Sequence, residues 1–184
     1  NGMFAACGSF NQPLNSWDVS NVTDMGLLFY GANSFNQDLS SWDVSNVTNM
    51  TWVFAYAHSF NQDLTSWDVS SATDMHAMFR QNQGFNGDIS NWDVSNVTNM
   101  WTMFDHAYDF SGDISNWDVS NVTNMSYMFN KANKFNQDLI IQNINQSGNK
   151  LGKVPIENDL SCDMDIAIPA SPPHSISRNI SNGI

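Results

Sequence analysis

The sequence predicts an α/β repeat solenoid, with a parallel β-sheet on one face and short helices on the other. A strict period is the first observation behind this prediction, since a tryptophan recurs every 25 residues without insertion or deletion, as Trp17, Trp42, Trp67, Trp92 and Trp117. The second is that every period contains a strand-like pattern followed by a helix-like one. Self-similarity at a fixed period of this length is typical of stacked repeats.

The strand of each period is expected around its tryptophan. Trp42 and Val44 are two residues apart, so they would share one face of an extended chain, and Asp43 would lie on the other face. Tryptophan and valine also favour strands by intrinsic propensity. Repeating this pattern once per period predicts a parallel sheet with one strand from each repeat.

The helix of each period is expected to begin near Thr48, a residue type suited to an N-cap. Met50, Val53, Phe54 and Ala57 follow at the spacing i, i+3, i+4 and i+7, which forms one apolar stripe on a helix. The sequence therefore predicts a short helix packed on the sheet in every repeat.

Two regions are expected along the chain. Residues 1–144 form a solenoid of about five repeats, which ends in a polar capping strand over Ile140–Ile144, where Gln142 replaces the tryptophan. Residues 145–184 hold four of the five prolines and are expected to be an irregular tail or linker. The chain begins partway through a repeat, which suggests a fragment of a longer protein.

The charge balance narrows the classes of partner. The formal net charge is −12, and residues 1–139 contain 14 aspartates against Arg80, Lys131 and Lys134. Such a surface repels phosphate groups, so nucleic acid is not an expected partner, whereas a basic protein is. There is no run of 18 or more apolar residues, so direct membrane insertion is not expected either.

One aspartate per period gives the first candidate binding site. In stacked strands about 4.8 Å apart these carboxylates would form a row about 19 Å long. The row could bind Ca²⁺ or basic groups of a partner, or the carboxylates could face water and accept local hydrogen bonds. With the neighbouring serines, the predicted polar strand face consists of Asp18, Asp43, Asp68, Asp93, Asp118, Ser45, Ser70 and Ser95.

Three aromatic residues give the second candidate site. Trp52, Trp101 and Tyr127 stand at a variable position just after the methionine column and are expected near the helix face. Large aromatic side chains at a partly exposed position are typical of interaction patches. Packing between neighbouring helices is an equal alternative.

Catalysis is not expected from this chain. It shows no nucleophile–base pair, phosphate-binding loop or zinc spacing, and identical units produce rows of like groups rather than converging unlike ones. No catalytic residue, no metal ligand and no cofactor is therefore predicted, apart from the Ca²⁺ alternative above. Cys7 aligns with Ala32 and Ala57 and is expected to be a buried helix residue, too far from Cys162 for a disulfide.

The repeat itself resembles known ones. Leu39-x-x-Trp42-x-Val44-x-x-Val47 parallels the leucine-rich-repeat pattern, and the chain resembles the BspA-like leucine-rich-repeat family. It is more similar still to the 25-residue Mycoplasma-type surface-protein repeat, whose hallmark is Trp-Asp-Val-Ser-Asn-Val-Thr-x-Met. This resemblance, over residues 1–139, implies a parallel-sheet solenoid, an extracellular or cell-surface setting, and a role in adhesion or recognition without a shared catalytic site.

Three functions are compatible with these observations. The first is a non-enzymatic recognition or adhesion module that binds a protein partner through the repeat surface. The second is a structural subunit or stalk fragment in a larger assembly. The third is ice or polysaccharide binding by a flat polar face, which is less favoured because the Thr-x-Thr signature and exposed aromatics are missing from that face.

Overall fold

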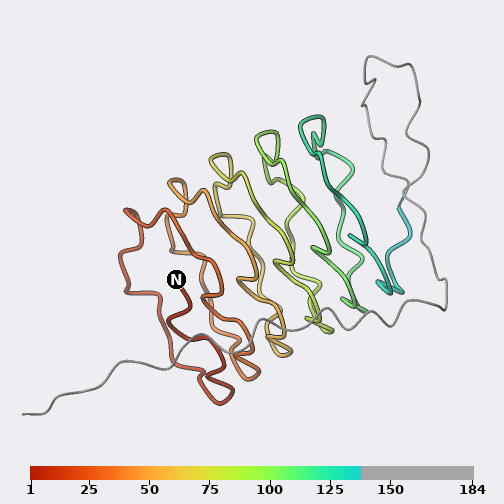
Figure 1. The fold of residues 1–184 in the computed structure, drawn as a ribbon. Coiled ribbons are helices and arrows are strands. Elements are labelled where there is room, and N and C mark those ends of the chain that lie inside the picture. The colour runs from red at the N-terminus through yellow and green to blue at the C-terminus, as the bar shows by residue number, and fades with distance from the viewer. Residues whose placement is uncertain (138–184) are drawn as a thin grey trace, which may run out of the picture.

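The computed structural model describes residues 1–137, which form a row of irregular coils lying side by side (Figure 1). One coil corresponds to one 25-residue period. The backbone N–H of Met50 donates to the carbonyl of Asp74 at 2.9 Å, and the N–H of Thr48 donates to the carbonyl of Thr23 at 2.9 Å. Equal periods therefore stack, and like residues form columns. The expected capping strand and the tail over 145–184 lie outside the described residues.

The predicted fold class is wrong. Residues 1–137 contain no helix and no extended strand, so the chain is not an α/β solenoid of the leucine-rich-repeat kind. The β-structure of this region consists of isolated parallel bridges, which join Asp24 to Asn49, Asn49 to Asp74, Asp74 to Asn99, and Asn99 to Asn124. Regular elements are replaced by tight turns in every coil.

The segment expected to be helical is a chain of turns, which we call the turn segment of each coil (residues 25–32, 50–57, 75–82, 100–107 and 125–132). In a helix every N–H would bond within the segment, four residues back. Here the N–H groups of Met50, Trp52, Phe54 and Tyr56 instead donate to carbonyls 24 residues further along the chain, at 2.9–3.0 Å. Pairing between coils therefore replaces the helix.

Two residues in each turn segment adopt left-handed backbone conformations that a helix excludes. Trp52 has φ of 60° and Tyr56 has φ of 59°, and the same two positions are positive in the following coils. At the second of these positions the N–H of Ala57 donates to the carbonyl of Phe54 at 3.1 Å, which closes a turn whose third residue is Tyr56. Positive φ at the third position is what a type II turn requires.

The apolar stripe nevertheless marks the buried side of this segment. Met50, Val53, Phe54 and Ala57 are all fully buried. The spacing i, i+3, i+4 and i+7 thus identifies which side chains face the core, but in this chain it is produced by consecutive turns rather than by a helix.

The segment expected to be a strand also turns, and we call it the Trp segment (residues 14–22, 39–47, 64–72, 89–97 and 114–122). The N–H of Trp42 donates to the carbonyl of Leu39 at 3.1 Å, and that of Val47 to Val44 at 2.9 Å. Two such turns prevent the extended conformation of a strand. Trp42 and Val44 are still buried and Asp43 is exposed, as the alternation predicted.

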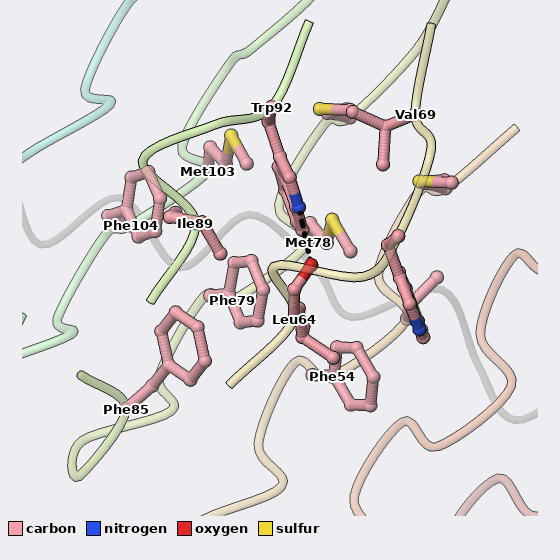
Figure 2. Packing of buried hydrophobic residues seen from close by; sticks show 14 of the residues in the cluster. Phe54, Leu64, Val69, Met78, Phe79, Phe85, Ile89, Trp92, Met103 and Phe104 are labelled. Atoms are coloured by element: carbon pink, nitrogen blue, oxygen red, sulfur yellow. Dashed lines mark hydrogen bonds between the residues drawn. The ribbon is translucent and has the colours of Figure 1, made fainter. Parts of the chain in front are cut away.

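The core is a set of aromatic columns that runs through the stack. Successive phenylalanines of one column, such as Phe54 and Phe79 or Phe79 and Phe104, have ring centres 5.6 Å apart. Within a coil, the rings of Phe79 and Phe85 stack at 3.9 Å. Figure 2 shows these rings with Trp92 and the methionines around them. Each coil is therefore buried by its neighbours.

Hydrogen bonds also join the columns of the Trp segments. The indole N–H of Trp92 donates to the carbonyl of Leu64 at 2.9 Å, drawn as the dashed line in Figure 2. Trp42, Trp67 and Trp117 make the same bond to the previous coil. Because Trp17 lies in the first described coil, it has no such partner in residues 1–137 and is 43% exposed.

Asparagine side chains supply a third kind of link. The side-chain oxygen of Asn36 accepts the backbone N–H of Asn61 at 3.0 Å, and Asn61 accepts that of Asn86 at 2.7 Å. These asparagine side chains thus satisfy backbone N–H groups of the next coil. Side chains here replace the backbone ladder that a sheet would supply.

Candidate functional site

The aspartate row of the Trp segments is exposed, and it is held by local hydrogen bonds. Asp43 accepts the backbone N–H of Ser45 at 3.1 Å and its hydroxyl at 2.6 Å. Asp18 makes the same pair of bonds to Ser20. Ser45 is half-buried, and its hydroxyl is directed at Asp43 rather than presented to a partner. This is the side-chain turn that aspartate favours in loops.

The same contacts recur along the row. The backbone N–H groups of Ser70, Ser95 and Ser120 each lie 3.0 Å from the carboxylate two residues earlier, which belongs to Asp68, Asp93 or Asp118. The residues of the predicted polar face therefore do form a column, but the column lies on turns and not on strands.

These hydrogen bonds stabilise the charged form of the carboxylates. The pKa of Asp43 is lowered because the Ser45 hydroxyl, and then its backbone N–H, donate to the carboxylate. The pKa values of Asp18, Asp93 and Asp118 are lowered for the same reason. Among residues 1–137 no lysine or arginine pairs with this row. The row is thus an uncompensated line of negative charge.

The three predicted helix-side aromatics do not share one column. Trp101 directly follows Met100, whereas Trp52 and Tyr127 come two residues after Met50 and Met125. All three lie on the turn segments and none on a helix. Trp52 and Trp101 are half-buried, while Tyr127 is 58% exposed and has no aromatic ring packed on it within the described region.

Trp52 and Trp101 are joined by a residue that the sequence did not single out. His76 lies between them, with its ring centre 5.3 Å from Trp52 and 4.6 Å from Trp101. Tyr30 extends the cluster, at 5.9 Å from Trp52 and 5.5 Å from Tyr56. We call these five residues the aromatic patch. Three of its members could have been found only by asking which positions differ from one coil to the next.

Burial shifts the titration of two members of the aromatic patch. Desolvation lowers the pKa of His76, against the opposing effect of the Asp74 carboxylate. Desolvation also raises the pKa of Tyr30. The nearby Tyr56 raises this pKa further, whereas the charge of Arg80 lowers it. Both side chains are therefore held in their neutral forms near pH 7.

Arg80 connects the aromatic patch to a buried carboxylate. Its guanidinium carbon lies 5.5 Å from the centre of the Trp52 ring, and its Nε lies 3.0 Å from Oδ2 of Asp105. The Asp105 side chain is only 4% exposed. Its Oδ1 lies 2.7 Å from Nδ1 of His106 and accepts a hydrogen bond from the side-chain amide of Asn130 at 2.8 Å. Asp105 thus fixes Arg80 against the patch.

Cys7 differs from the prediction. It is exposed and not a buried helix residue, because it lies in the first described coil, where no further described coil covers it. Within residues 1–137 no three His, Cys, Asp or Glu side chains are arranged to hold a metal ion. In the same residues, no helix of the length and apolarity needed to cross a membrane is found.

Comparison with known proteins gives one match. The family described as "Mycoplasma protein of unknown function, DUF285" matches residues 1–85 and, in an overlapping second match, residues 60–153. No curated protein and no solved structure matches the chain. The two family matches together span most of the sequence and all of the described coils. The chain therefore belongs to the Mycoplasma DUF285 family.

Proposed function

We propose that this protein is a non-enzymatic recognition module that binds a protein partner through the face formed by its turn segments, the turn face. The observation that carries the proposal is that side-chain identity varies between coils mainly on this face. The position after the methionine column illustrates it, because it is occupied in successive coils by Gly26, Thr51, His76, Trp101 and Ser126.

The invariant columns explain why variation on this face is tolerated. The phenylalanine and tryptophan columns face the core and link neighbouring coils, so they are constrained by packing. The turn face has the same backbone in every coil, including the left-handed positions at Trp52, Ala77 and Thr102. A fixed backbone that presents different side chains at equivalent positions is a general means of building a specific binding surface in repeat proteins.

The side chains on this face also suit protein recognition. Tryptophan, tyrosine and arginine carry most of the binding energy in protein interfaces. Trp52, Tyr56 and Arg80 gather here, half-buried, with their rings fixed by contacts to neighbouring coils. Rings that are already ordered lose little conformational freedom on binding. By resemblance to the surface-protein repeat, we place this function outside the cell or at its surface.

A comparison of two variants tests the proposal. Trp52→Ala with Trp101→Ala removes both indoles of the aromatic patch, and Ser41→Ala with Ser66→Ala changes exposed residues of the Trp segments as a matched control. Proteins retained from native material by the intact chain and by the control, but lost by the double tryptophan variant, are the expected result. Equal retention by both variants, with both shown to be folded, would contradict a binding role for the turn face.

A further inference from the structure

We propose that the segment recognised by the aromatic patch is basic and presents arginine side chains. This inference rests on the proposed function and names the chemistry of the partner. It follows from three features of the patch: a guanidinium already bound to it, the carboxylates beside it, and the net charge of the stack.

Arg80 shows within the chain how the aromatic patch accommodates a guanidinium group. The guanidinium lies over the Trp52 ring while its Nε contacts the carboxylate of Asp105. An aromatic face combined with a carboxylate is the environment that arginine favours over lysine, because its planar group can stack and fork at once. The chain thus contains one example of the interaction that we propose for the partner.

The remaining charges near the aromatic patch are negative. Asp24 and Asp74 lie in the column two residues before the position of His76, and neither is in an ion pair within residues 1–137. The hydrogen-bond donors to these carboxylates are neutral: Asp24 accepts from Asn1, Gly26 and Asn49, and Asp74 accepts from the backbone of His76 and from Asn99. No basic side chain of residues 1–137 therefore compensates either carboxylate.

The charge of Arg80 does not reverse this field, because Asp105 compensates it. Across residues 1–137 there are 13 aspartates against Arg80, Lys131 and Lys134, and Lys134 is itself paired with Asp109. A surface of one sign attracts ligands of the opposite sign and accelerates their encounter. Of the ligands that aromatic rings bind, a cationic one is therefore the best fit.

Part of each ring remains available for such a ligand. Tyr30, Trp52, Tyr56 and Trp101 are half-buried, and His76 fills the gap between the two indoles. Trp101 is contacted by the ring of His76, and the guanidinium of Arg80 lies over the ring of Trp52. A partner arginine would thus extend along the patch the interaction that Arg80 makes at Trp52.

Calorimetric titration of the intact chain with blocked peptides of one length and spacing tests the inference. The peptides carry arginine, lysine, the neutral isostere citrulline, or glutamate. The arginine peptide should bind at least about tenfold more tightly than the citrulline peptide and measurably more tightly than the lysine peptide, and higher salt should weaken its binding. Equal affinity for arginine and citrulline would overturn the inference.

Two sets of variants separate the aromatic patch from general attraction to a negative surface. Trp52→Leu with Trp101→Leu should weaken the arginine peptide by about tenfold or more, and Asp24→Asn with Asp74→Asn, which keeps the rings, should weaken it by a smaller factor. The control is Asp43→Asn with Asp68→Asn and Asp93→Asn, which removes more charge away from the patch. If this control costs as much affinity as the tryptophan variant, the inference is wrong.

The outcomes also distinguish this inference from the proposed function. If an uncharged peptide binds at the aromatic patch and the tryptophan variant abolishes that binding, the basic partner is excluded and the recognition function stands. If neutral oligosaccharides bind there and no peptide does, both proposals fail. Unfolding curves of each variant show whether a loss of binding reflects a loss of structure.

Discussion

The indole nitrogen of Trp67 donates a hydrogen bond to the backbone carbonyl of Leu39, which lies 28 residues earlier at 3.1 Å. Trp67→Phe deletes this donor, so that the Leu39 carbonyl keeps only the backbone N–H of Trp42, and it opens space in the core. We expect a loss of about 1–3 kcal/mol in the free energy of unfolding, measured by chemical denaturation. Trp17→Phe is the control, because Trp17 is 43% exposed, and should cost less than about 1 kcal/mol. Equal losses would contradict a structural role for this bond.

The sequence predicted the stacking and the buried side chains well, because both follow from the spacing of residues. Trp42, Phe54 and Ala57 are buried as expected. It did not predict the backbone, because a stripe such as Met50 to Ala57 fits a helix as well as it fits two consecutive turns. The choice depends on where alternate N–H groups find acceptors, and here these acceptors lie 24 residues away. No pattern local to the segment carries that information.

The left-handed residues of the turn segments give the second prediction. Gln81 has φ of 58°, a conformation that costs a non-glycine residue free energy. Gln81→Gly should therefore raise the free energy of unfolding by about 0.5–1 kcal/mol, since the strain exceeds the entropy that glycine loses. Gln83→Gly, two residues later and without positive φ, should lower it by a similar amount. Denaturation curves in which both variants shift in the same direction would refute this account.

The buried carboxylate of Asp105 gives the third prediction. Its side chain is 4% exposed and meets Arg80, His106 and Asn130. Asp105→Asn removes the countercharge of Arg80, and we expect a loss of about 2 kcal/mol, less than the loss of about 3–5 kcal/mol for a fully buried pair because Arg80 is a quarter exposed. Asp109→Asn breaks the exposed pair with Lys134 and should cost less than about 1 kcal/mol. A cost for Asp105→Asn as small as that of the control would show that the network is not stabilising.

The candidate site was only partly accessible from the sequence. The repeat pattern predicted a site at the aspartate row around Asp43, where the structure shows local turns. It gave no sign of the positions that differ from one coil to the next. His76 and Arg80 each occur once in their columns, so no periodic pattern marks them. Their contacts to Trp52 connect residues from different coils, and these contacts depend on which side of the turn each side chain occupies.

His76 gives the fourth prediction, which concerns pH. Desolvation lowers its pKa in the folded chain, whereas in the unfolded chain the pKa is about 6.5. As the pH falls through 6.5, the unfolded state takes up a proton that the folded state does not, so the free energy of unfolding decreases. Stability should thus be highest above pH 7 and decline towards pH 5. The aspartates with lowered pKa values contribute only at more acid pH, as the pH falls through those values.

Denaturation midpoints measured between pH 8 and 5 check this prediction, and His76→Gln should flatten the decline. His58→Gln removes an exposed imidazole on the same face and should retain it. The direction of the effect matters, because a histidine stabilised by the neighbouring Asp74 carboxylate would become more stabilising as the pH falls. A rise in stability towards pH 5 that His76→Gln abolishes would mean that the attraction of Asp74 outweighs desolvation between the two indoles.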